Sequence, residues 1–217
     1  MHGRMPLPKE VTFVTFDVYG TLIDWENGIR AAFERAGVDG SEALRRYAEI
    51  EPLVERERYR PYREVLAETA ARIAPNADPR FLAQSLGSWM PFADTNPSLE
   101  RLRAAGIRLG ILSNIDDNLL TATRRHFTVG FDLIVTAQQV QSYKPAHAHF
   151  LEARARIGDA RWLHAAQSNF HDIVPCNGLG IANAWINRHA EAPQPGGTPR
   201  YEFPDLSSLA DALIPST

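Results

Sequence analysis

Residues 11–21 read Val-Thr-Phe-Val-Thr-Phe-Asp-Val-Tyr-Gly-Thr, an apolar and β-branched run that stops abruptly at Asp17. Such a run, bounded by turn residues, predicts a strand buried in a sheet. Ligands of open α/β sheets bind beyond the carboxyl ends of the strands, and this end presents a carboxylate. Asp17 is therefore a candidate nucleophile that forms a covalent ester with its substrate. The alternative is a helix cap, because Asp is a favoured cap and turn residue.

Three further apolar runs, residues 107–112, 131–136 and 162–166, also end in polar residues. Together with Asp17 they supply a nucleophile, a hydroxyl with an amide, an ammonium group and a second carboxylate. We expect these groups to form one site assembled from separate loops. Each of these groups could instead be an ordinary turn or helix-cap residue, and the lysine could lie on the surface. The residues after the three runs are, in order, Ser113-Asn114, Tyr143-Lys144-Pro145 and Gln167-Ser168-Asn169-Phe170-His171-Asp172.

Strand and helix patterns alternate in the outer parts of the chain, which predicts a mostly parallel sheet with helices on both faces. Residues 25–92 break this alternation with helical spacing and no convincing strand. Helices are predicted over residues 41–60, beginning at Ser41, and over residues 61–73. We therefore expect an α/β protein with an inserted helical segment, residues 25–92. An alternative is that this segment only packs against the rest.

The order and spacing of these residues resemble the haloacid dehalogenase superfamily of hydrolases, and within it the type II L-2-haloacid dehalogenases. The resemblance extends over residues 11–188, and its specific strings are Asp-Val-Tyr-Gly-Thr and Tyr-Lys-Pro. It implies a Rossmann-like parallel core, residues 1–24 and 93–217, and a helical cap domain, residues 25–92. In the resembled family such a cap closes over the nucleophile and contacts the substrate.

The resemblance also implies a reaction and its catalytic residues. Asp17 displaces halide from a short L-2-haloacid and holds the substrate as an aspartyl ester. Lys144 favours the charged form of Asp17, and Asp172 acts on the water that hydrolyses the ester. The products are halide and the inverted 2-hydroxy acid, and Asn114 helps to receive the halide. The substrate-binding residues implied by the resemblance are Tyr19, Thr21, Ser113, Asn114, Ser168 and Asn169.

Tyr19 separates two branches of the superfamily. Phosphatases of the superfamily usually carry a second Asp two residues after the nucleophile, as the acid for the leaving group. A halide leaves without a proton, so we expect a dehalogenase that uses neither a metal nor a cofactor. One alternative is a Mg²⁺-dependent phosphatase, with Asp17, Asp172 and the Tyr19 carbonyl as ligands. Another is a catalytically idle relative whose cap binds a protein.

Several positions depart from the type II pattern. Gln167 stands in place of a Ser, His171 in place of an aromatic residue, and Phe150 in place of a Tyr. The resembled enzymes grip the substrate carboxylate with a cap arginine, for which this chain offers several candidates. Arg45 and Arg46 come first, followed by Arg56, Arg58, Arg60 and Arg63.

Composition narrows the function classes. The 217 residues carry a formal net charge of -3, which offers no general attraction to nucleic acid. No apolar stretch approaches the ~20 residues that span a bilayer. The N-terminus lacks a signal-peptide core, so we expect a cytoplasmic protein. The expected partner is a small halogenated carboxylate, and the resemblance is compatible with a homodimer.

Overall fold

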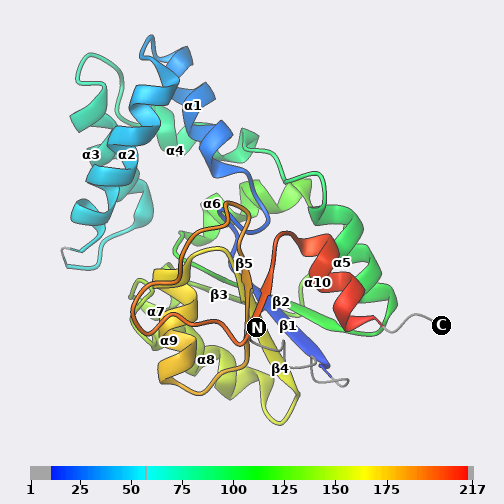
Figure 1. The fold of residues 1–217 in the computed structure, drawn as a ribbon. Helices are drawn as coiled ribbons and strands as arrows, with labels where there is room; N and C mark the ends of the chain where they lie inside the picture. The colour runs from blue at the N-terminus through cyan, green and yellow to red at the C-terminus, as the bar shows by residue number, and fades with distance from the viewer. Residues whose placement is uncertain (1–10, 57, 215–217) are drawn as a thin grey trace.

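A six-stranded parallel sheet forms the centre of the computed structural model, which describes residues 11–56 and 58–214 (Figure 1). Neighbouring strands pair in parallel throughout, in the spatial order β3-β2-β1-β4-β5-β6. The predicted α/β fold with a Rossmann-like parallel core is therefore confirmed. The strands are β1 (Phe13–Phe16), β2 (Arg108–Ser113), β3 (Leu133–Thr136), β4 (Trp162–Ala166), β5 (Asn183–Ile186) and β6 (Tyr201–Phe203).

Side chains of β1 alternate between the two faces of the sheet, as the twofold repeat of a strand requires. Val14 and Phe16 pack into one apolar cluster with Leu99, while Phe13 packs into another with Phe150. Both clusters are buried, which explains why β1 is a continuous apolar run. Helices cover both faces (Figure 1): α5 (Thr95–Ala104) and α10 (Leu206–Leu213) on one, α7 (Ala137–Val140), α8 (Ala148–Ile157) and α9 (Val174–Gly178) on the other.

Four helices between β1 and α5 gather in a group beyond one end of the sheet (Figure 1). Apolar residues of this group, among them Phe33 and Leu66, share a buried cluster with Val18 and Ile115. Because Val18 follows β1 and Ile115 follows β2, the helices pack where these strands end. The helices are α1 (Trp25–Arg35), α2 (Gly40–Glu55), α3 (Tyr62–Ile73) and α4 (Phe81–Ser85).

The start of α2 corrects a sequence-based prediction. Asp39, and not Ser41, is the N-cap, and its carboxylate accepts a hydrogen bond from the Glu42 amide at 2.8 Å. An Asp side chain at the cap satisfies an amide that the first helical turn leaves unpaired, so α2 begins at Gly40. The helix also ends earlier than predicted, at Glu55.

After β2 the chain forms α6 (Asp117–Thr123), which is followed directly by a 3₁₀ turn, Arg124–His126. None of the helices that the structure describes is long and apolar enough to cross a membrane.

Gly28 is a test of the packing of α1. A methyl group at this position would overlap the indole ring of Trp89, which is 4% exposed. We expect Gly28→Ala to destabilise the protein by about 1–3 kcal/mol, the usual cost of overpacking. This reverses the ordinary gain of replacing a helical glycine with alanine. Thermal unfolding measures the effect, and the control is Gly178→Ala, whose methyl group would meet open space. A Gly28→Ala protein as stable as the control would contradict this packing.

Candidate active site

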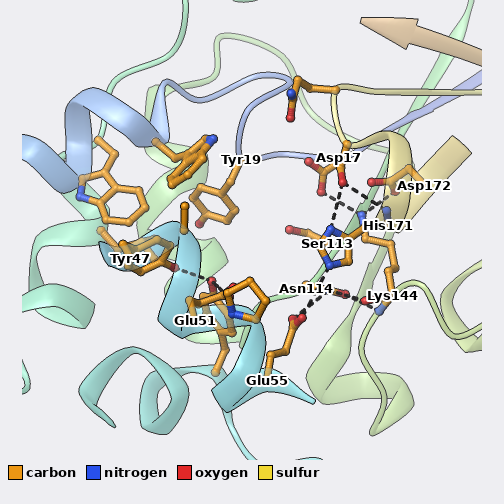
Figure 2. Close-up of a pocket in the computed structure, with 18 residues that line it drawn as sticks. Asp17, Tyr19, Tyr47, Glu51, Glu55, Ser113, Asn114, Lys144, His171 and Asp172 are labelled. Carbon is orange, nitrogen blue, oxygen red and sulfur yellow. Dashed lines mark hydrogen bonds and ion pairs between the residues drawn. The ribbon is translucent and has the colours of Figure 1, made fainter. Parts of the chain in front are cut away.

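Lys144 joins two buried carboxylates at the carboxyl edge of the sheet (Figure 2). Its ammonium group donates hydrogen bonds to Asp17 at 2.9 Å, to Asp172 at 2.7 Å and to the Leu112 carbonyl at 3.0 Å. An ammonium group has three N–H donors, so all of them are used. Asp17, Lys144 and Asp172 are 6%, 1% and 0% exposed. The structure therefore brings together the three side chains to which the sequence analysis gave catalytic roles.

The two carboxylates have different electrostatic environments. Burial raises the pKa of Asp17, and Lys144 opposes this shift. Burial also acts to raise the pKa of Asp172, but Lys144 and His164 together hold that pKa below its ordinary value. The pKa of Lys144 lies above its usual value because its two carboxylates outweigh the effect of burial. Carboxyl groups whose pKa values are pushed apart are suited to different roles in one reaction.

A chain of buried hydrogen bonds holds Asp172 from behind. The Trp162 indole donates to the Thr15 hydroxyl at 2.7 Å, and that hydroxyl lies 2.8 Å from Nδ1 of His164. Nε2 of His164 lies 2.9 Å from Oδ1 of Asp172. A carboxylate only accepts, so Nε2 of His164 carries the proton of this contact and donates it to Asp172. Oδ2 of Asp172 is buried and has no hydrogen-bond partner among the described residues.

Asp17 and Asp172 form part of the lining of a pocket of about 290 Å³ (Figure 2). This volume suits a small molecule of a few heavy atoms. The core contributes polar side chains to the lining, while the α1–α4 group contributes aromatic and acidic ones. The lining includes Asp17, Ser113, Asn114, Lys144, Ser168, His171 and Asp172, with Tyr19, Trp25, Tyr47, Glu51, Glu55, Tyr62 and Trp89.

Most of the predicted substrate-binding residues lie at or beside this pocket. Tyr19 lines it, with its hydroxyl 2.8 Å from the Thr123 hydroxyl. The Thr21 hydroxyl lies 3.4 Å from Asp17 and accepts from the Gln167 amide, so it ties the loop after β1 to the loop after β4. The Ser113 hydroxyl is buried and has no hydrogen-bond partner among the described residues.

Ser168 lines the pocket and shapes the turn that carries Asp172. Its hydroxyl caps the π-helical turn Asn169–Ile173 by accepting from the His171 amide. It also lies 2.9 Å from Nδ1 of His171. The cap of this turn is thus Ser168, and the next helix, α9, has Ile173 and not Asp172 at its N-cap position.

Two predicted amide residues have other partners. The Asn114 side chain accepts from the Lys144 backbone amide and donates to the Lys144 carbonyl and to Glu55. Asn114 therefore positions the backbone of Lys144 and contacts Glu55 of α2. Asn169 is not part of the lining of this pocket, because its amide bonds to Gly197 and Gln194 in the loop after β5.

None of the candidate arginines is among the residues that line the pocket. Arg45 forms ion pairs with other α2 side chains, and Arg46 donates to backbone carbonyls at the end of α3. Arg63 pairs with Asp116 at 3.1 Å. Arg60 pairs with Glu68 at 2.6 Å. Arg56 lines an adjoining pocket that shares Glu55, Ser168 and His171 with this one, whereas none of the candidate arginines lines the pocket of Asp17 itself.

Glu51 and Glu55 are pocket residues that the sequence analysis missed. Their spacing of four places both on one side of α2, which is the available signal in the sequence. The Tyr62 hydroxyl donates to Glu51 at 2.8 Å, and Glu55 lies 3.7 Å from Nε2 of His171. Burial, together with the charge of Glu55, raises the pKa of Glu51 to about 7.

A metal would find few ligands here. No group of three or more His, Cys, Asp or Glu side chains in residues 11–56 and 58–214 is arranged to hold one. Oδ1 of Asp17 and Oδ1 of Asp172 are both bound to the Lys144 ammonium group. His149 is buried, with Nε2 3.2 Å from the Ser113 carbonyl.

The raised pKa of Glu51 predicts a pH-dependent stability. Between about pH 4.5 and 7 the unfolded chain releases a proton that the folded protein keeps, so this group lowers stability as pH rises through that window. We expect Glu51→Gln to raise the melting temperature relative to the parent more at pH 8 than at pH 5. Each kcal/mol corresponds to about 2–4 °C for a chain of this size. Glu49→Gln, which alters an exposed ion pair of the same helix, is the control. A stability difference that does not vary with pH would contradict the burial of Glu51.

Comparisons with known proteins agree with the family resemblance found in the sequence. The family model described as haloacid dehalogenase-like hydrolase matches residues 11–166. (S)-2-haloacid dehalogenase H-109 of Pseudomonas putida is 28% identical, over 93% of this chain and 97% of that protein. The (S)-2-haloacid dehalogenase of Pseudomonas sp. strain YL is 27% identical, over 91% and 92% of the two chains. A solved dehalogenase with an intermediate complex shares the fold, with a TM-score of 0.85 at 19% identity over 97% of this chain and 100% of that one.

Proposed function

Because the chain belongs to the haloacid dehalogenase-like hydrolase family, we propose that it removes halide from a small organohalide through a covalent ester on Asp17. The observation that carries this proposal is the buried array in which Lys144 holds Asp17 and Asp172 at the floor of the pocket. The relatives named (S)-2-haloacid dehalogenase suggest a short L-2-haloacid as the substrate. The product would then be the inverted 2-hydroxy acid.

In the first step an oxygen of Asp17 attacks the carbon that bears the halogen. Oδ2 is the candidate, because Lys144 holds Oδ1. A carbon–oxygen bond forms, the carbon–halogen bond breaks, and its electron pair leaves with the halide. Fixing the carboxylate behind the carbon lowers the entropic part of the barrier. This step inverts the configuration of the carbon.

In the second step water attacks the carbonyl carbon of the Asp17 ester. Asp172 Oδ2 is the base for this step, since Oδ1 is occupied by Lys144 and His164. The negative charge that develops on the Asp17 oxygen is stabilised by the Lys144 ammonium group. The bond between the Asp17 carbonyl carbon and the substrate oxygen breaks, that oxygen takes the proton that Asp172 removed from water, and the hydroxy product leaves. The second proton of the water passes to solvent as Asp17 returns to its carboxylate form. Neither step calls on a metal ion.

The chain is divided into two domains with different roles in the proposed reaction. Residues 11–24 and 93–214 belong to the core that carries Asp17, Lys144 and Asp172, and the predicted residues 1–10 and 215–217 of this domain lie outside the described residues. Residues 25–92 form the cap, whose aromatic side chains limit the access of water to the reacting carbon.

Replacement of Asp17 by asparagine tests the nucleophile. Asp17→Asn keeps the shape of the side chain but removes its negative charge, so ester formation should stop. We expect halide release to fall by at least about a thousandfold, measured over a panel of haloacetates and 2-halopropionates. Asp211→Asn, at an exposed carboxylate of α10, is the control and should keep full activity. Halide release from Asp17→Asn at the parental rate would exclude the ester. Phosphate release from a parallel ester panel with Mg²⁺, without halide release, would favour the phosphatase alternative.

The fate of water tests the second step. A single turnover in oxygen-18 water should place the label in the Asp17 carboxylate, because water attacks the enzyme's own carbonyl carbon. Asp172→Asn should slow ester hydrolysis more than ester formation, so the Asp17 peptide should accumulate the mass of the dehalogenated substrate. Mass spectrometry of that peptide reads both outcomes. Label that enters the product directly, with Asp17 unlabelled, would mean that water attacks the substrate.

A further inference from the structure

The wall of the pocket across from Asp17 is acidic. Glu51 and Glu55, both on α2, line the same pocket as Asp17 and Asp172 (Figure 2). The side chain of Glu55 is 9% exposed, and its Oε1 accepts a hydrogen bond from the side-chain amide of Asn114 at 3.0 Å. A carboxylate of the protein therefore holds the amide that the family resemblance assigned to the departing halide.

Each cationic side chain of the lining is paired with carboxylates of the protein itself. Lys144 uses all three N–H groups on Asp17, Asp172 and the Leu112 carbonyl. The His171 ring faces the Ser168 hydroxyl at 2.9 Å on one nitrogen and Glu55 at 3.7 Å on the other. Among the described residues, the lining thus contains no cation without a carboxylate partner of the protein.

Aromatic rings fill the space beside the two glutamates. Trp25 and Tyr47 lie with ring centroids 5.7 Å apart, and Tyr19 meets Trp89 edge to face at 5.9 Å. The faces of such rings attract ammonium groups. The buried Ser113 hydroxyl, which has no hydrogen-bond partner among the described residues, adds a polar position on the Asp17 side of the pocket (Figure 2).

We infer that the polar group of the substrate is an N–H donor, an ammonium or primary amide group held by Glu51 and Glu55, in place of a carboxylate. This inference rests on the proposed function, since Asp17 still attacks the carbon that carries the halogen. Above the pKa of about 7 of Glu51 both glutamates are charged, so an anionic carboxylate placed beside them would be repelled, whereas an ammonium group would be attracted. An amide would be accepted because its N–H groups pair with carboxylate oxygens.

Three substrates with one carbon skeleton separate these cases. They are (S)-2-chloropropionate, 2-chloropropionamide and 2-chloropropylammonium, tested for chloride release at pH 7.5 against a blank without enzyme. We expect kcat/KM for the ammonium or the amide compound to exceed that for the carboxylate by at least tenfold. The better of the two identifies whether the group is charged or neutral. A carboxylate that is the best of the three would overturn the inference and leave the dehalogenase proposal intact.

Removal of one glutamate charge provides a second readout. Glu51→Gln should lower the ratio of ammonium to carboxylate kcat/KM about tenfold. The control Glu49→Gln should leave that ratio unchanged, because Glu49 pairs with Arg45 and is not part of the lining. A ratio that Glu51→Gln does not change would count against the assigned role of the acidic wall.

Binding of unreactive analogues makes the inference independent of catalysis. Calorimetry with propylammonium, propionamide and propionate measures recognition by the parent protein without any halide. If no chlorinated compound releases halide, the proposed function fails, and tighter binding of propylammonium or propionamide than of propionate would still support the recognition by Glu51 and Glu55. Propionate that binds as tightly as both others, or no binding of any analogue, would overturn the inference.

Discussion

The ion pairs of Lys144 with Asp17 and Asp172 are the interaction on which the site depends. Removing charges from water is costly unless each is paired and hydrogen-bonded, and here one ammonium group satisfies two carboxylates and a backbone carbonyl. These bonds tie together the ends of β1 and β2, the loop after α7 and the turn after β4. Loss of the lysine would leave buried carboxylates without their counter-charge, so the same contacts serve both the stability of the loops and the chemistry.

The floor of the pocket, with Asp17, Lys144 and Asp172, and its wall, with Glu51 and Glu55, come from different parts of the fold. The floor is built from the carboxyl ends of parallel strands, where the relay through Thr15 and His164 fixes one oxygen of Asp172. The wall comes from α2, which brings Glu51 and Glu55 to the pocket. The floor therefore carries the groups of the proposed reaction, and the wall carries the groups proposed to bind the polar part of the substrate.

Much of the core was predictable because its signals are local. The run before Asp17 is apolar at every position from Phe13 to Phe16 apart from Thr15, which predicts a buried strand, and β1 is one of the central strands of the sheet. The predicted α/β fold is confirmed, and so is the family, which was predicted from a resemblance in the strings Asp-Val-Tyr-Gly-Thr and Tyr-Lys-Pro. Boundaries were less accurate, since Asp39 and Ser41 are both good caps and only the surrounding structure selects between them.

The sequence alone shows that polar side chains follow successive strands. Because parallel pairing brings those strand ends to one edge of the sheet, Asp17, Lys144 and Asp172 could be grouped in advance. The rotation of α2 about its own axis, in contrast, is set by tertiary packing. Its packing against α1 and α3 turns Glu51 and Glu55 toward the pocket, while Arg45 pairs with acidic side chains outside it. Helical periodicity relates the residues of one helix to each other, but it carries no information about which face meets a distant loop.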